Sequence, residues 1–381
     1  PSVGSSPQST GVERNAGANE GGAATTTGTA SGTEAGTGTG VGGSTPTSAL
    51  GAERDCATKA PGANLSQCDL ANADLKNARL TKADLSSTKL TKANLTGARL
   101  SGANLTNADL TGADLSGASL TGANLTGAVL TGAKLTSVKL AGTNLKKVSL
   151  PNVSMVGVDL SEANLSGADL SGTDLTDANL TKTNLKRAKL AKAKLIGANL
   201  TQATLIKADL TKADLTKATL TKADLTSAQL SEATLTKALL KKATLTKADL
   251  TKADMTHAIL TRAVLQEAIL VEATLDSTDL KAANLVKADL TKANATKAVL
   301  IAADLRKAVL VKTKLTEADL TIANLREANL TEADLESANF TKADLDGAIL
   351  KGVRVKLTIF SGARWADGTR CTAAPPPGTC R

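Results

Sequence analysis

Four cysteines and one histidine are the residues of this 381-residue chain whose types best suit metal or redox chemistry. Cys56 and Cys68 lie close together in the sequence, as do Cys371 and Cys380, and His257 is far from both pairs. Neither pair has the CxxC spacing that is typical of zinc sites. Four cysteines allow three disulfide pairings, and four free thiols are the alternative. The spacing predicts no metal site.

The remaining polar residues offer no catalytic group. His257 stands in the word THAIL at an outward position, where we expect a solvated side chain. The many aspartates belong to a repeated word, so pairs of carboxylates arise by repetition and not in a special environment. No glycine-rich phosphate loop and no calcium-binding nonapeptide repeat is present. We therefore predict no enzyme activity, no catalytic residue and no cofactor.

The elements that position these residues are repetitive. Aromatic residues make up 1% of the chain although 41% is apolar, which indicates many copies of one small unit. From residue 63 the sequence runs in words of five, and 54 of the 61 word centres between Leu65 and Trp365 are leucine. The residue two before each centre is small. The other centres are Met155, Met255, Ala295, Phe340, Val355, Phe360 and Trp365.

A period of five excludes the regular structures. On an α-helix, successive leucines would advance by about 140° and leave no buried stripe. In a flat strand, alternate leucines would face opposite sides. The pattern is satisfied if each word is a short extended side followed by a corner, with every leucine and every small residue pointing inward. The sequence therefore predicts an all-β solenoid.

Words such as TGADLSGASLTGANL and TKADLTKATLTKADL resemble the pentapeptide-repeat family, whose pattern is A(N/D)LXX. The resemblance implies a right-handed quadrilateral parallel β-helix with four pentads per coil. Sixty-one pentads then make about 15 coils and a rod roughly 70 Å long. We expect a Gly/Ser/Thr/Ala-rich tether at residues 1–55, the β-helix at 56–365 and a capping tail at 366–381.

Irregular words predict local features of the rod. Residues 20 apart should stack, which places Phe340 beneath Phe360, next to Trp365 at the C-terminal end. Ala295 should leave a void or a local collapse. Val138, Val148, Val153 and Val158 cluster around Pro151 and Met155, where we expect a widening or a bend.

In a rod of this length the cysteine pairs are too far apart to join each other, which leaves Cys56–Cys68 and Cys371–Cys380. The similar cysteine arrangement in secreted bacterial members of the family supports export to an oxidising compartment. The alternative is four free thiols in a cytoplasmic protein, with Cys68 filling a small inward position. No apolar run is long enough to span a membrane, and because the sequence begins at Pro1, an export signal upstream is compatible with it.

The net charge of the solenoid indicates which kinds of partner the protein could bind. Some family members protect DNA gyrase and are thought to mimic DNA with an acidic surface, whereas residues 56–365 carry a net charge of +11. A gyrase-interacting DNA mimic is therefore the least favoured function. Lysine is dense from residue 182 to 312, and Lys182, Lys207 and Lys292 are candidate contacts for nucleic acid or cell-wall phosphates. A solvated face that blocks lateral aggregation is the alternative.

The sequence thus predicts a non-catalytic scaffold rod that contacts an unknown protein or surface. An exported bacterial protein, extracellular or in the cell envelope, is the favoured setting. A basic module for an anionic polymer is the second function. The rod is expected to be a monomer or an end-to-end homodimer.

Overall fold

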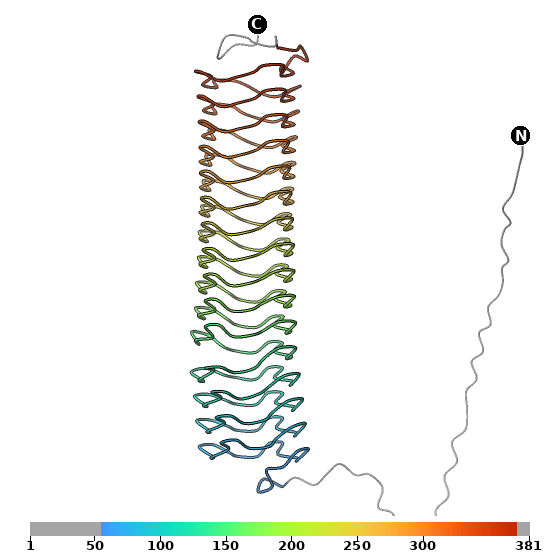
Figure 1. Ribbon diagram of the computed structural model, residues 1–381, viewed down its shortest axis with the longest axis vertical. Helices are drawn as coiled ribbons and strands as arrows, with labels where there is room; N and C mark the ends of the chain where they lie inside the picture. The colour runs from blue at the N-terminus through green and yellow to red at the C-terminus, as the bar shows by residue number, and fades with distance from the viewer. Residues whose placement is uncertain (1–54, 372–381) are drawn as a thin grey trace, which may run out of the picture. The chain divides into compact units, whose positions relative to one another are not determined.

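The rod is built from square coils of 20 residues. The computed structural model describes residues 55–371, and these contain neither a helix nor a strand longer than one bridging residue. Isolated parallel bridges join residues 20 apart, from Asn64–Asp84 to Asp344–Arg364. Figure 1 shows the coils stacked along one axis. The expected fold class, an all-β right-handed quadrilateral parallel β-helix with four pentads per coil, is confirmed.

Each corner of a coil is a tight turn. The carbonyl of a centre leucine accepts a hydrogen bond from the N–H three residues later, as in Ala98 to Leu95 at 2.9 Å. The third residue of the turn has a positive φ at every corner, which is the defining feature of a type II turn. Glycine takes this conformation without strain, yet 45 non-glycine residues adopt it, Lys207 among them (φ 56°). The strain is offset because the N–H of this residue bonds to the next coil, from Lys207 to the carbonyl of Thr226 at 3.0 Å.

The Asn or Asp before each leucine has a local role. The pentad's other N–H groups find backbone acceptors along most of the rod, but the N–H of the residue directly after the leucine, the second residue of the turn, has none. In most pentads with Asn or Asp, the side-chain oxygen accepts that N–H, as Asp109 does from Thr111 at 3.0 Å. This Asx turn is the physical reason for the (N/D) of the repeated word.

The interior is a column of leucine between layers of alanine. Almost every centre leucine and small residue is fully buried. Seven small positions hold threonine, and each hydroxyl donates to the carbonyl of the centre residue 23 positions earlier, as Thr183 does to Leu160 at 2.8 Å. These buried hydroxyls are therefore satisfied. The other six threonines are Thr88, Thr143, Thr173, Thr278, Thr313 and Thr358.

The two ends of the described rod differ. At the N-terminal end, a disulfide joins Cys56 to Cys68 with a Cα separation of 5.7 Å. At the C-terminal end, the rings of Phe340 and Phe360 lie 5.4 Å apart, and Trp365 meets Phe360 edge-on at 4.9 Å. Three packed aromatic rings therefore take the place of leucine in the core of the last coils.

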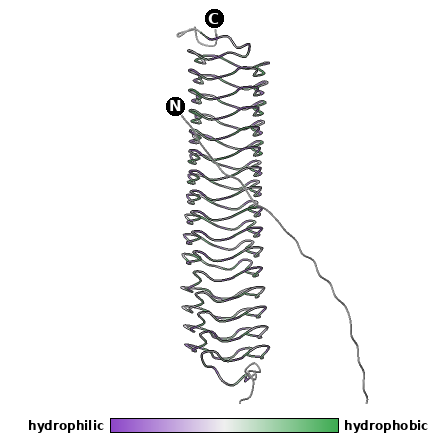
Figure 2. Cartoon of the chain, turned by 90° about the vertical axis from the view of Figure 1, so that its right-hand side faces the viewer, coloured by the Kyte–Doolittle hydropathy of each residue, from purple (hydrophilic) through white to green (hydrophobic). Residues whose placement is uncertain are grey.

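The valine cluster coincides with a break in the hydrogen-bond ladder. Within the described coils, the N–H groups of Gly132, Leu135, Ser137 and Leu140 do not bond to the next coil, unlike their counterparts along most of the rod. The bridge that the register would form between residues 134 and 154 is also missing. Figures 1 and 2 show the coils spread apart at this level. Valine is bulkier than alanine at the position where coils approach closely, so the expected widening has a steric cause.

The tether assigned to residues 1–55 lies, apart from Asp55, outside the described residues, as does the tail beyond Cys371. Cys371 is buried and takes part in a disulfide. Cys380 lies outside the described residues.

Ala295 interrupts the leucine column without disturbing the backbone. Its N–H bonds to Lys314 at 2.7 Å, the same distance as from Leu315 to Asp334. Because the coil spacing is kept, Ala295→Leu should fill the column and stabilise the rod by about 0.5–2 kcal/mol. Leu315→Ala should cost about 2–5 kcal/mol. Urea denaturation followed by circular dichroism measures both. A lower midpoint for Ala295→Leu would show that neighbouring side chains have closed the space.

Candidate functional site

Function on this rod has to lie on outward side chains, because the interior is filled with aliphatic groups. His257 is exposed at a corner. Among the described residues, no cluster of His, Cys, Asp or Glu is arranged to hold a metal ion. No helix in the described chain is long and apolar enough to cross a membrane.

The three lysines singled out from the sequence do not meet. They stand on three different corners of the coil, as their positions in the 20-residue register require. Lys182 pairs with Glu162 and Lys292 pairs with Glu272, each at 3.3 Å. Lys207 forms no ion pair within the described rod. A binding surface made from these three residues is therefore not present.

Many outward charges are paired with residues one coil away. The side chains at one corner lie in a column with 20-residue spacing, and opposite charges in a column form ion pairs. Glu272 lies between Lys252 and Lys292, at 3.7 Å and 3.3 Å. These groups are about half exposed, so each pair adds little stability. Their effect is to remove unpaired charge from the surface.

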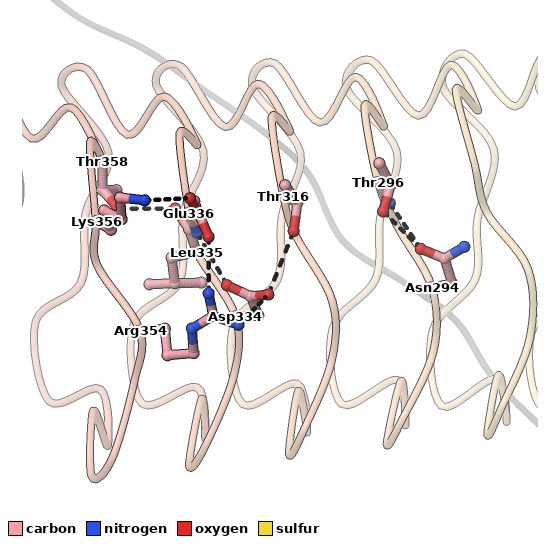
Figure 3. Close-up of polar contacts among 9 residues, drawn as sticks. All are labelled: Asn294, Thr296, Thr316, Asp334, Leu335, Glu336, Arg354, Lys356 and Thr358. Atoms are coloured by element: carbon pink, nitrogen blue, oxygen red, sulfur yellow. Dashed lines mark hydrogen bonds and ion pairs between the residues drawn. The ribbon is translucent and has the colours of Figure 1, made fainter.

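The last coils show this neutralisation on a neighbouring side as well. Arg354 reaches Asp334 at 3.2 Å and Glu336 at 2.7 Å, and Lys356 also pairs with Glu336 at 3.4 Å (Figure 3). The hydroxyl of Thr316 donates to Asp334. Figure 3 shows the charges of Asp334, Glu336, Arg354 and Lys356 paired with one another, and Asn294 and Thr296 as a separate hydrogen-bonded pair.

Two of the turn aspartates, Asp109 and Asp174, have lowered pKa values and are ionised at neutral pH. The Thr176 hydroxyl donates to Asp174 at 2.6 Å and holds the pKa of that carboxyl below its ordinary value, although partial burial opposes the shift. The hydroxyl of Thr111, with the N–H of the same residue, lowers the pKa of Asp109 in the same way. Carboxylates with lowered pKa values are poor proton donors at neutral pH, so these residues do not supply a general acid.

Other outward cations have no acidic partner among the described residues, and four of them come together on one corner. Lys146, Lys147, Lys186 and Arg187 are exposed and form no ion pair with any described residue. They line a depression over Ser166 and Gly167, which we call the basic notch. Sequence reasoning did not find it, although writing the chain in columns of 20 places Gly167 between Lys147 and Arg187.

The fold defines the class of protein, a quadrilateral β-solenoid built from five-residue units. A family model described as pentapeptide repeats (8 copies) matches overlapping segments that together cover residues 61–221, 223–321 and 323–362. The chain belongs to the pentapeptide repeat family. Members of this family are generally non-enzymatic structural repeat proteins.

Three solved structures are among those similar to this chain. HetL, involved in heterocyst differentiation regulation in the cyanobacterium Nostoc, is 35% identical over 61% of this chain and 94% of its own, with a TM-score of 0.33. One structure of QnrB1, a plasmid-mediated fluoroquinolone resistance protein, is 25% identical over 45% and 84%, with a TM-score of 0.34. Rfr23 from the cyanobacterium Cyanothece is 36% identical over 26% and 63%, with a TM-score of 0.17. A search of curated proteins found no match.

Proposed function

We propose that this protein is a non-catalytic scaffold rod that holds a protein partner or surface at a set distance. The observation that supports this most is the constant 20-residue register of the bridges from Asn64 to Arg364, which the missing bridge between residues 134 and 154 does not shift. No loop interrupts the coils in this range, so no segment is available to build an enclosed active site. The long, regular side faces suit contact with an extended partner.

Surface charge argues against imitation of DNA. The solenoid is basic overall, and many of its acidic groups pair with lysine or arginine one coil away, as Glu232 does with Lys212 at 3.4 Å. A DNA mimic needs a continuous row of unpaired negative charge. A gyrase-interacting role therefore remains the least favoured function.

A spacer built from equal coils should tolerate the removal of one whole coil. Deletion of residues 201–220 joins Leu200 to Thr221 with every column in register, and the rod should shorten by about 4.8 Å. Deletion of residues 201–203 is the matched control, because it breaks the five-residue phase and should cause loss of ordered coils. Circular dichroism and small-angle X-ray scattering measure the two outcomes. Unfolding of the 20-residue deletion would contradict a modular spacer.

We also propose that the protein is exported, to the cell envelope or the extracellular space, with a cytoplasmic location as the alternative. The Cys56–Cys68 bond and the oxidised state of Cys371 support an oxidising compartment. Thiol titration of denatured, natively purified protein should find no reactive thiol. Four reactive thiols would contradict export.

Binding of an anionic polymer is the second candidate function. It is favoured by mid-rod cations without an acidic partner in the described chain, such as Lys222, Lys242 and Arg262, which follow one another on one corner. Such a column should retain duplex DNA or polyphosphate at about 50 mM salt and release it as salt rises. Chromatography on immobilised DNA and on immobilised polyphosphate tests this, and absence of retention on both at low salt would exclude the polymer.

A further inference from the structure

The basic notch interrupts a column of charged corner residues. On this corner, Lys147, Gly167 and Arg187 follow one another at 20-residue spacing, and Lys146, Ser166 and Lys186 precede them in the chain. Neighbouring coils are about 4.8 Å apart, so the two cationic pairs are separated by roughly 10 Å with one small, uncharged pair between them. Lysine and arginine side chains are long enough to converge on that gap from both sides.

The same chain shows how such a gap can be filled. On another corner, Glu272 lies between Lys252 and Lys292 and pairs with both, at 3.7 Å and 3.3 Å. Glu272 has a φ of 58°, so glutamate is accepted at this corner position. At Gly167 there is no intervening carboxylate, and the cations on both sides lack the anion that Glu272 provides on its own corner.

Neighbouring residues do not supply that anion. The side of the coil that directly precedes the notch in the sequence carries neutral Asn144, Asn164 and Asn184. On the side of the coil that directly follows the notch, Asp169 forms an ion pair with Lys189 at 3.9 Å and accepts a hydrogen bond from the Ser171 hydroxyl at 2.7 Å.

The floor of the notch offers a hydrogen-bond donor. The backbone N–H of Ser166 donates a hydrogen bond to the side-chain oxygen of Asn164. The half-buried hydroxyl of Ser166 makes no hydrogen bond with a described residue. Gly167 adds no side chain above it, so an oxygen-rich group can approach this hydroxyl between the four cations.

We propose that the basic notch binds a compact phosphate-bearing ligand, with one phosphate group over Gly167. Lys146 and Lys147 contact it from one coil, and Lys186 and Arg187 contact it from the coil beyond. A guanidinium and several ammonium groups around one hydroxyl donor match the oxygen-rich, multiply charged phosphate better than a single carboxylate. The cations extend on this corner to Lys207, but the column ends at Gly127 on the other side. The span of a few coils suits two or three linked phosphates rather than a long polymer.

The test uses the full chain and inorganic tripolyphosphate as the probe, with isothermal titration calorimetry at low salt. The native protein should bind one equivalent. Gly167→Glu should weaken binding at least tenfold, because the new carboxylate pairs with Lys147 and Arg187 as Glu272 pairs with its own neighbours. Arg187→Gln, which leaves Gly167 in place, should weaken binding about fivefold or more.

The matched control is Gly112→Glu. Gly112 also has a positive φ, and its position meets Lys92 (Cγ at 3.5 Å from the added Cβ) as Gly167 meets Lys147 at 3.6 Å. This variant makes the same change in net charge on a different corner and should keep the affinity within twofold. Circular dichroism confirms that all variants are folded.

Three results would overturn the proposal. One is absence of tripolyphosphate binding to the native protein, and another is equal weakening by Gly167→Glu and Gly112→Glu. The third is binding of long-chain polyphosphate alone with no sensitivity to Gly167→Glu, which would assign the affinity to the basic columns in general. The scaffold function does not depend on the outcome.

Discussion

The hydrogen bond from one coil to the next is the interaction on which the rest of the structure depends. Along most of the rod, each pentad forms such bonds on both sides of its corner, and they fix the spacing at which leucine, alanine and the turn can all be accommodated. Only a small residue fits two positions before the leucine, because the coils approach closely there. The same spacing lets Asn and Asp cap the turn, and it sets the distance over which outward charges meet. Stability is therefore a sum over neighbouring coils and not a property of one central core.

This spacing also shapes the surface chemistry. Side chains 20 residues apart are neighbours, so a charge is neutralised or reinforced by the composition of its column. In the C-terminal coils, opposite charges meet across coils, as Arg354 does with Asp334. In the middle of the rod, the columns hold cations without partners among the described residues, and four of them line the basic notch. Specificity on such a rod arises from departures from the repeated word.

The sequence was sufficient for the coil and for several of its details, because these follow from periodicity. The inward leucines, the small layer, the Phe340–Phe360 contact and the disturbance near Pro151 could all be read at spacings of five and 20. The hydrogen bond from the Thr183 hydroxyl to the Leu160 carbonyl could not be predicted from the sequence, because it depends on the position of a carbonyl in another coil. The notch was missed since lysines were considered singly, and Lys182, Lys207 and Lys292 lie on separate corners. Column neighbours, rather than local density, decide which charges remain unpaired.

The break in the hydrogen-bond ladder between residues 132 and 159 has a mechanical consequence. When a rod is pulled along its axis, every coil contact carries the same force, so extension begins at the contact with the fewest bonds across it. That contact lies near the N-terminal third of the solenoid, where the bonds expected from Leu135 and Leu140 are not formed. The rod therefore consists, under tension, of a short segment held by the Cys56–Cys68 bond and a longer stiff segment. The valines around Pro151 determine where the rod yields first.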